Sequence, residues 1–200
     1  MGRRKYQEAD DHGLITDEDG KPLVLYRGQH GSTSIQTRLP SISFGTESAA
    51  LIYSNSPNDR IKDTVAKNPS VVRAHLKIKK PVLNDPDDPF MDLSVLIGAV
   101  GDEIARAAAI RHADHIENTN NWDDISSETR IDFVEQFLEK YPGRLVDLYL
   151  NAFPLFDDPK VIDALKEAGF DGAIYGGVGD NALEVEYRVF DKDQIVVVSS

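Results

Sequence analysis

Apolar and polar residues alternate at every second position near both ends of the chain, which is the pattern of half-buried strands. This alternation, together with short apolar runs, predicts strands at residues 23–27, 41–44, 71–78, 173–175, 184–190 and 195–198. Elsewhere the apolar residues recur with the spacing of one helix face. That spacing predicts helices at residues 47–54, 93–111, 131–141 and 159–168. We therefore expect strands on both sides of a helical block.

Turn and capping residues separate these elements. Residues 17–22 (DEDGKP) form a turn sequence, and residues 28–40 and 55–68 are polar connections. Asp158, which a proline follows, has the features of a helix N-cap, and Gly169 ends the same helix.

The order of the elements indicates a fold class. The chain has no repeating strand–helix–strand rhythm, which argues against a doubly wound parallel sheet. We expect an α+β fold with a small mixed or antiparallel β-sheet, built as one domain over residues 1–200. A helical insertion at about residues 86–157 interrupts the strands.

Composition argues against several classes of function. The absence of cysteine excludes disulfides, thiolate metal sites and a cysteine nucleophile. The net charge of -12 disfavours a nucleic-acid partner, because the average surface repels a phosphate backbone. No apolar run is long enough to cross a bilayer and no secretion signal opens the chain. We therefore expect a soluble protein without a membrane partner, in the cytoplasm or delivered into the cytoplasm of a target cell.

Tyr26-Arg27-Gly28 is the first candidate site. A charge at the end of an apolar strand is costly to bury unless it meets an anion. Gly28 would let a ligand approach the backbone closely. Arg27 is therefore a candidate for binding a phosphate or a ribose, although an ordinary salt bridge at the rim of the sheet would also explain it.

Two strand segments carry polar side chains at alternate positions, which lie on one face. Ser41 and Ser43 can both face a cleft, or form the polar side of a half-buried strand. Glu184 and Glu186 lie about 7 Å apart by strand geometry, so they can raise each other's pKa and serve in base catalysis or charge stabilisation. The alternation of Glu184, Glu186 and Arg188 with apolar residues also fits a solvated face.

Two further motifs carry less information. Residues 176–180 (GGVGD) lead into a strand rather than opening a helix, which does not fit a dinucleotide-binding fingerprint, and we interpret them as a flexible loop beside the site. His112 and His115, with Asp114 between them, could bind a metal, but no further ligand cluster accompanies them. We expect no metal.

The order of these motifs resembles the ADP-ribosyltransferase superfamily, especially its bacterial and phage members. The resemblance rests on residues 17–28 (DEDGKPLVLYRG), 41–54 (SISFGTESAALIYS), 71–81 and 165–195. It implies the split β-sheet of that superfamily, and NAD⁺ as the substrate from which ADP-ribose is transferred. The helical block matches no part of the family pattern.

The resemblance also implies roles for single residues. Arg27, next to Gly28, would bind a phosphate or the nicotinamide-side ribose. Ser43, together with Ser41, would hold the catalytic glutamate and the nicotinamide pocket. Glu186 would be that catalytic glutamate, bonded to the ribose 2′-hydroxyl.

Further residues would act on the acceptor and on nicotinamide. Glu184 would prepare the acceptor, and Phe44 or Tyr53 would stack on the nicotinamide ring. Arg27 and the Glu-x-Glu pair favour the Arg-Ser-Glu class of the superfamily over its His-Tyr-Glu class, although Tyr53 lies near the stacking tyrosine of the second. Ile42 stands where the first class has threonine.

We therefore expect a mono-ADP-ribosyltransferase that releases nicotinamide and modifies a macromolecule, a protein rather than a nucleic acid, with arginine as the favoured target. A toxin or effector of this kind could also have an immunity or activating partner. Three alternatives stay open: an NAD⁺ glycohydrolase with water as acceptor, a non-catalytic binding module on the same scaffold, and a metal-dependent hydrolase that uses His112 and His115.

Overall fold

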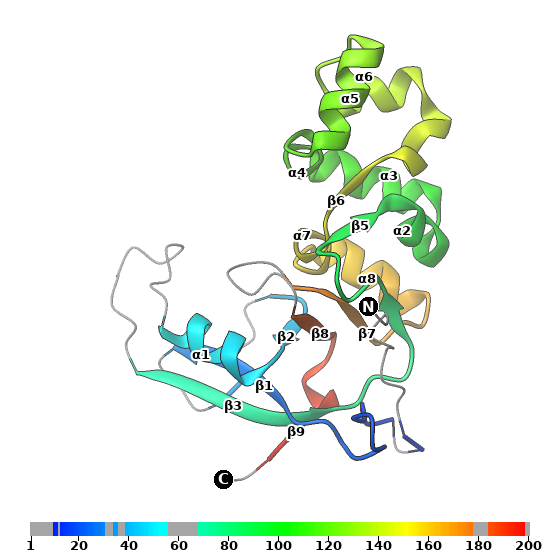
Figure 1. Cartoon of the computed structure of the whole chain (residues 1–200). Helices are drawn as coiled ribbons and strands as arrows, with labels where there is room; N and C mark the ends of the chain where they lie inside the picture. The colour runs from blue at the N-terminus through cyan, green and yellow to red at the C-terminus, as the bar shows by residue number, and fades with distance from the viewer. Residues whose placement is uncertain are drawn as a thin grey trace.

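The chain has an α+β structure in which a helical block stands on a base of β-sheets (Figure 1). The computed structural model describes residues 10–11, 13–30, 34–35, 39–55, 68–177 and 184–198. The predicted fold class is confirmed to this extent: helices and strands are mixed, and the sheets are antiparallel or mixed. Among the helices of the described ranges, none is long and apolar enough to cross a membrane.

The first sheet brings together strands from both ends of the sequence. It contains β1 (Leu25–His30), β3 (Pro69–Leu76) and β9 (Ile195–Val197), with β3 in the centre and both pairs antiparallel. Helix α1 (Glu47–Asn55) lies against this sheet (Figure 1). β1 begins two residues later than the predicted strand, which started at residue 23, and continues to His30, through positions predicted to be a loop.

The second sheet has the order β2 (Ile42–Phe44), β8 (Val185–Val189), β7 (Gly172–Gly176) and β4 (Pro81–Leu83). β8 pairs antiparallel with both β2 and β7, whereas β7 and β4 are parallel. The sheet is therefore mixed, and β8, from near the C-terminus, lies at its centre between two strands far from each other in sequence.

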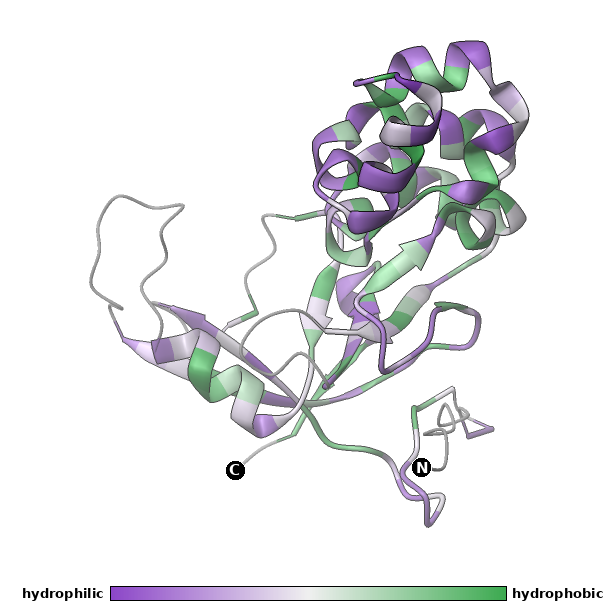
Figure 2. Cartoon of the chain, turned by 45° about the horizontal axis from the view of Figure 1, so that its top comes forward, coloured by the Kyte–Doolittle hydropathy of each residue, from purple (hydrophilic) through white to green (hydrophobic). Residues whose placement is uncertain are grey.

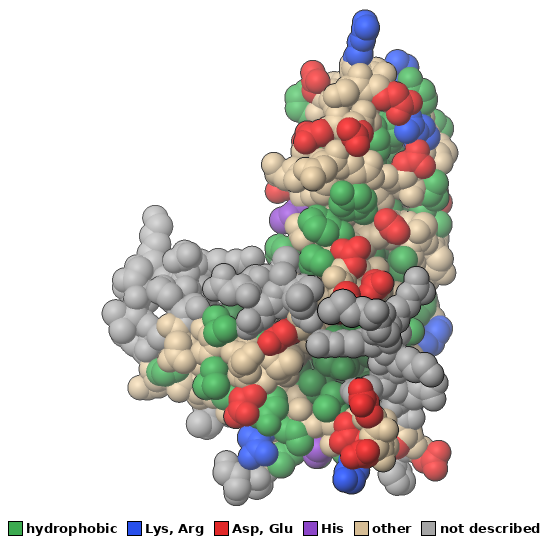
Figure 3. All heavy atoms as spheres, in the orientation of Figure 1, with side chains coloured by type: hydrophobic (Ala, Val, Ile, Leu, Met, Phe, Trp, Pro, Cys, Tyr) green, Lys and Arg blue, Asp and Glu red, His purple; other side chains and the backbone are tan. Residues whose placement is uncertain are grey.

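The helical block lies between two short strands, β5 (Phe90–Asp92) and β6 (Tyr149–Asn151), which pair antiparallel. In chain order, the block contains α2 (Leu93–Val100), α3 (Asp102–Arg111), α4 (Ala113–Glu117), α5 (Asn120–Thr129), α6 (Val134–Lys140) and the 3-10 helix η1 (Pro142–Asp147). Apolar and polar segments alternate along these helices (Figure 2), and acidic side chains are spread over the visible face of the block (Figure 3).

Two helices return the chain from the block to the second sheet. These are α7 (Ala152–Phe156) and α8 (Pro159–Glu167), and a short 3-10 helix, η2 (Lys192–Gln194), later leads into β9. The capping prediction for α8 is confirmed, because the Asp158 side chain accepts a hydrogen bond from the Lys160 backbone N–H at 2.9 Å.

Two hydrophobic clusters hold these layers together. One joins the two larger sheets and includes Leu25, Phe44 and Leu76. The other fills the helical block and continues onto the second sheet through Ala173 and Tyr175. The block and the second sheet therefore share one apolar core.

One predicted helix is divided in the structure for a local reason. The helix predicted over residues 93–111 is broken at Gly101, whose φ of 86° belongs to a region that L-residues rarely adopt. Residues 14–16, which precede the predicted turn, make isolated bridges between Leu14 and Lys77 and between Thr16 and Pro22. The polar segment 55–68 lies almost wholly outside the described residues.

Candidate active site

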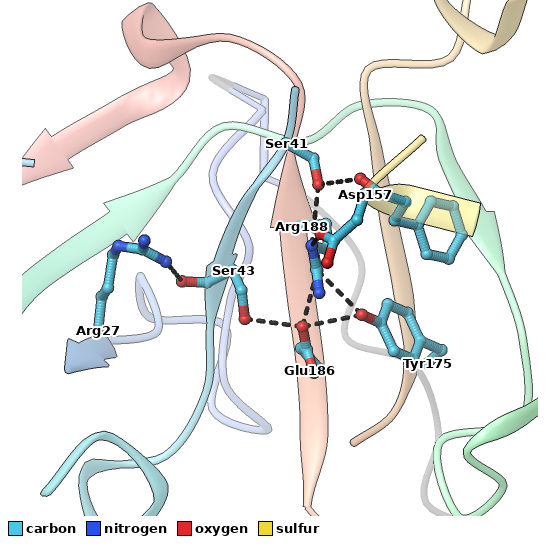
Figure 4. Close-up of polar contacts among 8 residues, drawn as sticks. Arg27, Ser41, Ser43, Asp157, Tyr175, Glu186 and Arg188 are labelled. Atoms are coloured by element: carbon cyan, nitrogen blue, oxygen red, sulfur yellow. Dashed lines mark hydrogen bonds and ion pairs between the residues drawn. The ribbon is translucent and has the colours of Figure 1, made fainter. Parts of the chain in front are cut away.

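The register of the second sheet brings polar side chains of three strands onto one face. Ser43 on β2 pairs with Arg188 on β8, and Glu186 on β8 pairs with Tyr175 on β7. Side chains opposite each other, or two residues apart on one strand, share a face of the sheet. These four side chains consequently meet above the centre of the sheet (Figure 4).

Three donors converge on one oxygen of the Glu186 carboxylate. Its Oε1 accepts from Ser43 Oγ at 2.7 Å, Tyr175 Oη at 2.8 Å and Arg188 Nε at 2.7 Å (Figure 4). No donor within the described ranges bonds its Oε2. The carboxylate is thus fixed through one oxygen, and the other oxygen keeps its hydrogen-bonding capacity.

Arg188 is the buried cation of the site, with 6% of its surface exposed. It lies between two carboxylates, with Nε at 2.7 Å from Glu186 and Nη1 at 2.5 Å from Asp157. Burial lowers the pKa of the guanidinium, but Tyr175 and the charges of Glu186 and Asp157 raise it by more, so the net shift is upward. Arg188 therefore stays protonated and holds both acids.

Tyr175 supports the same carboxylate from the core side. Its ring stacks on Phe156, with centroids 5.1 Å apart and planes inclined by 22°. Burial raises the pKa of the phenol well above its usual value, and Glu186 adds to this while Arg188 opposes it. The phenol is therefore neutral at physiological pH and donates a hydrogen bond to Glu186.

Arg27 approaches the site from the other side of β2. Its Nη1 donates to the Ser43 carbonyl oxygen at 2.9 Å (Figure 4). Its Nε is buried without a hydrogen-bond partner, and no carboxylate of the described residues pairs with it. Burial, with a contribution from Arg188, lowers the pKa of Arg27, but a free guanidinium has a pKa so high that the group stays charged. A half-buried cation of this kind suits an anionic ligand.

Glu184 has partners of its own. Its carboxylate accepts from Thr46 Oγ1 and, at 2.8 Å, from Ser48 Oγ, both near the start of α1. Glu184 and Glu186 are therefore held separately, the first by α1 and the second by the sheet.

The role predicted for Gly28 was wrong. A Cβ at this position would lie 2.1 Å from the Ala50 carbonyl oxygen and 2.9 Å from the Ser54 backbone nitrogen. The close approach at Gly28 is thus made by helix α1 and not by a ligand. The glycine allows α1 to pack on β1.

Phe44 was also wrongly predicted to stack on a ligand. Only 1% of its surface is exposed, and its ring belongs to the core between the two larger sheets. Tyr53 is different, because 60% of its surface is exposed and its ring stacks against His30 with centroids 6.1 Å apart. A ligand-stacking role for Tyr53 stays a prediction.

Ser41 was expected to face a cleft beside Ser43. Instead it lies in the interior, with 3% of its surface exposed. Its hydroxyl donates to the Phe156 carbonyl oxygen at 2.6 Å and accepts from Arg188 Nη1 at 3.1 Å. Ser41 therefore reaches Glu186 only through Arg188.

Sequence reasoning missed Tyr175 and Asp157, and named Arg188 only in the alternative interpretation of this strand as a solvated face. The alternation along β8 does put Arg188 on the face of Glu186, which was the available signal. Asp157 gave no signal, because it precedes the capping Asp158 and resembles an ordinary helix-flanking acid.

The two histidines have other partners. His112 Nε2 lies 3.1 Å from Asp158, and the His115 ring meets the edge of Phe153 at 5.6 Å. Within the described ranges, no group of three potential metal ligands occurs. Of the glycine-rich segment 176–180, only the first two residues are described.

Hollows of 460 Å³ and 370 Å³ lie away from this site. The larger is lined by residues that include Lys77, Lys166 and Phe170, and the smaller by residues of the helical block. Neither is lined by a residue of the Glu186 site.

No protein-family model matches the chain, and no curated protein or solved structure was found to match it. The assignment of a function therefore depends on the geometry described above.

Proposed function

We propose that this chain is a mono-ADP-ribosyltransferase, which takes ADP-ribose from NAD⁺ and releases nicotinamide. The observation that carries the proposal is the Glu186 carboxylate, fixed through Oε1 by three donors and open at Oε2 within the described ranges. Arg27, a cation without an ion-pair partner among the described residues, lies on the other side of Ser43 (Figure 4).

The reaction breaks the bond between nicotinamide and C1′ of its ribose. The bonding electrons leave with nicotinamide, which departs as a neutral molecule, and positive charge develops on the ribose. An acceptor nucleophile then bonds to C1′ and loses a proton. Because the nicotinamide ring carries a positive charge while it is bonded to the ribose in NAD⁺, no acid is needed to protonate it before it leaves.

Glu186 has the properties that this transition state needs. A fixed carboxylate gains interaction energy as positive charge develops beside it, and it does not have to reorganise at that moment. The hydrogen bond from Ser43 and the ion pair with Arg188 supply that fixation. In the proposal, Oε2 accepts a hydrogen bond from a ribose hydroxyl.

Arg27 supports the binding of the pyrophosphate of NAD⁺. A guanidinium binds phosphate oxygens through paired hydrogen bonds, and removal from water strengthens them. Only Nη1 of Arg27 has a partner among the described residues, so the other nitrogens retain donors for an anion.

Glu184 is the residue proposed to act on the acceptor. It lies outside the Glu186 network and is held by Thr46 and Ser48. A carboxylate at this position can orient or deprotonate a guanidinium, which favours an arginine side chain of a protein as target.

The proposal is tested by measuring nicotinamide release from NAD⁺ with and without a cell lysate. Release that the lysate stimulates, accompanied by labelled protein from radiolabelled NAD⁺, is the expected result. Equal release without lysate, with free ADP-ribose as the product, would identify a glycohydrolase. No release in either condition would contradict the proposal and favour a binding module.

A further inference from the structure

We propose that Asp157 and Arg188 are positioning residues for Glu186, through which the segment that returns from the helical block completes the active site. This inference rests on the proposed function, because the property that it explains is the rate of nicotinamide release. Asp157 directly follows α7 and belongs to the segment that returns from the block to the second sheet.

The geometry of Arg188 links the two acids rigidly. Nε bonds Glu186 at 2.7 Å, while Nη1 bonds Asp157 at 2.5 Å. Because a guanidinium is planar, fixing one of its nitrogens restricts the direction in which another can donate. Asp157 thereby determines where Arg188 holds Oε1 of Glu186.

The surroundings of Arg188 are arranged to maintain this direction. Nη1 also donates to Ser41 Oγ at 3.1 Å, and that hydroxyl donates to the Phe156 carbonyl oxygen at 2.6 Å. Phe156 and Asp157 are consecutive, so the same turn of chain contacts Arg188 directly and through Ser41.

The charges of this cluster also need Asp157. If Arg188 faced Glu186 alone, its charge would neutralise the carboxylate that the transition state is proposed to use. Asp157 supplies a second negative charge, so that the three groups together remain anionic. A site that stabilises developing positive charge requires this balance.

Asp157→Asn tests the inference directly. The amide keeps an oxygen that can accept from Nη1, but it removes the charge and weakens the hydrogen bond. We expect kcat for nicotinamide release to fall at least about tenfold, with KM for NAD⁺ within about threefold of the wild type. If Asp157 had a purely structural role, the substitution would instead lower the denaturation midpoint, and kcat would not fall selectively while KM stayed unchanged.

Asp102→Asn is the matched control. Asp102 lies in the helical block, where it forms an exposed pair with Arg106 at 3.4 Å, and its substitution by asparagine removes the same charge as Asp157→Asn. We expect wild-type kcat and KM from this variant.

Arg188→Lys gives a second test, which can be carried out even if Asp157→Asn does not fold. A lysine keeps the positive charge but cannot hold both carboxylates with the geometry of a guanidinium. We expect a similar loss of kcat. Asp157→Glu, which restores the charge, should recover part of the rate.

The outcomes separate this inference from the proposed function. If the wild type releases nicotinamide and Glu186→Gln does not, but Asp157→Asn keeps a kcat within about twofold of the wild type, the positioning role is wrong and the proposed function stands. A wild-type chain that releases no nicotinamide would overturn both.

Discussion

We expect the burial of Arg27 to cost the folded chain free energy. Burial lowers the pKa of its guanidinium, and its buried Nε has no partner in the described part of the chain. Arg27→Met removes an unsatisfied donor. We therefore expect the free energy of unfolding either to increase or to decrease by no more than about 1 kcal/mol. Affinity for NAD⁺ should fall at least about tenfold, since charge-assisted bonds to phosphate are lost.

Denaturant unfolding and calorimetric titration with NAD⁺ measure the two effects of Arg27→Met. Arg144→Met is the control, because Arg144 forms exposed ion pairs with Glu128 and Asp147 in the helical block. That variant should bind NAD⁺ like the wild type. Unchanged affinity in Arg27→Met would contradict an anion-binding role.

Tyr175 contributes one of the three donors to Glu186, and its raised pKa keeps the phenol protonated. Tyr175→Phe keeps the ring that stacks on Phe156 and removes only the hydroxyl. We expect kcat to fall about tenfold, because a bond to a carboxylate contributes roughly 1.5 kcal/mol or more. Steady-state kinetics test this, and a wild-type kcat would show that the phenol does not act on Glu186.

The contact between β1 and α1 depends on the absence of a side chain at Gly28. Gly28→Ala would force a Cβ against the Ala50 carbonyl oxygen, 2.1 Å away, and backbone on both sides leaves no flexible atom to move. We expect the free energy of unfolding to fall by about 3 kcal/mol. Chemical denaturation measures this loss.

Gly98 provides the comparison for Gly28. It lies inside helix α2, and a Cβ there would meet nothing within 4 Å. Gly98→Ala should therefore stabilise the chain by about 0.5–1 kcal/mol, which is the helix propensity of alanine over glycine. Equal effects of the two substitutions would contradict the close approach of α1 to β1.

Asp158 links the start of α8 to the end of α3. Burial raises the pKa of its carboxyl, but hydrogen bonds from Arg111, the Lys160 backbone and His112 lower it by more, so the net shift is downward. A folded pKa below the unfolded value of 3.8 means that the ionised group stabilises the fold fully above that value. This stability is lost as the pH falls through the lower, folded pKa.

We therefore expect the wild type to lose more stability than Asp158→Asn between about pH 5 and pH 2. Urea unfolding at the two pH values gives the difference. An equal loss in both proteins would show that Asp158 is not ionised in a stabilising pair.

Elements whose ends are set by local chemistry were predicted well from the sequence. Proline after Asp158 starts α8, and the alternating apolar residues define β2 and β8. The break at Gly101 was missed, because a glycine inside a helical pattern does not by itself reveal a positive φ. The extent of β1 was missed because pairing with β3, and not residue type, continues that strand to His30.

The order of strands could not be derived from the sequence. β8 lies between β2 and β7, and such non-consecutive pairing depends on contacts across the whole chain. Glu186 was predicted from a motif, but Tyr175 and Asp157 join it only through this arrangement. Ser43 and Glu186 were each predicted from the pattern of a single strand, and their side chains do form a hydrogen bond in the structure.

The helical block and the second sheet share a hydrophobic cluster, so we expect them to unfold together. Trp122, the single tryptophan, is buried in the block and reports on it by fluorescence. Far-UV circular dichroism reports on helices and strands together. Coincident denaturant midpoints would support the expectation of one domain over residues 1–200, whereas an earlier fluorescence transition would show that the block unfolds separately.

The central claim is that Glu186 acts in the chemical step rather than in binding. The most direct measurement compares nicotinamide release by the wild type and by Glu186→Gln, with NAD⁺ affinity determined for both by calorimetry. The account predicts that the glutamine variant loses at least about a hundredfold in kcat and keeps NAD⁺ affinity within about threefold. Near-normal turnover by Glu186→Gln would contradict it.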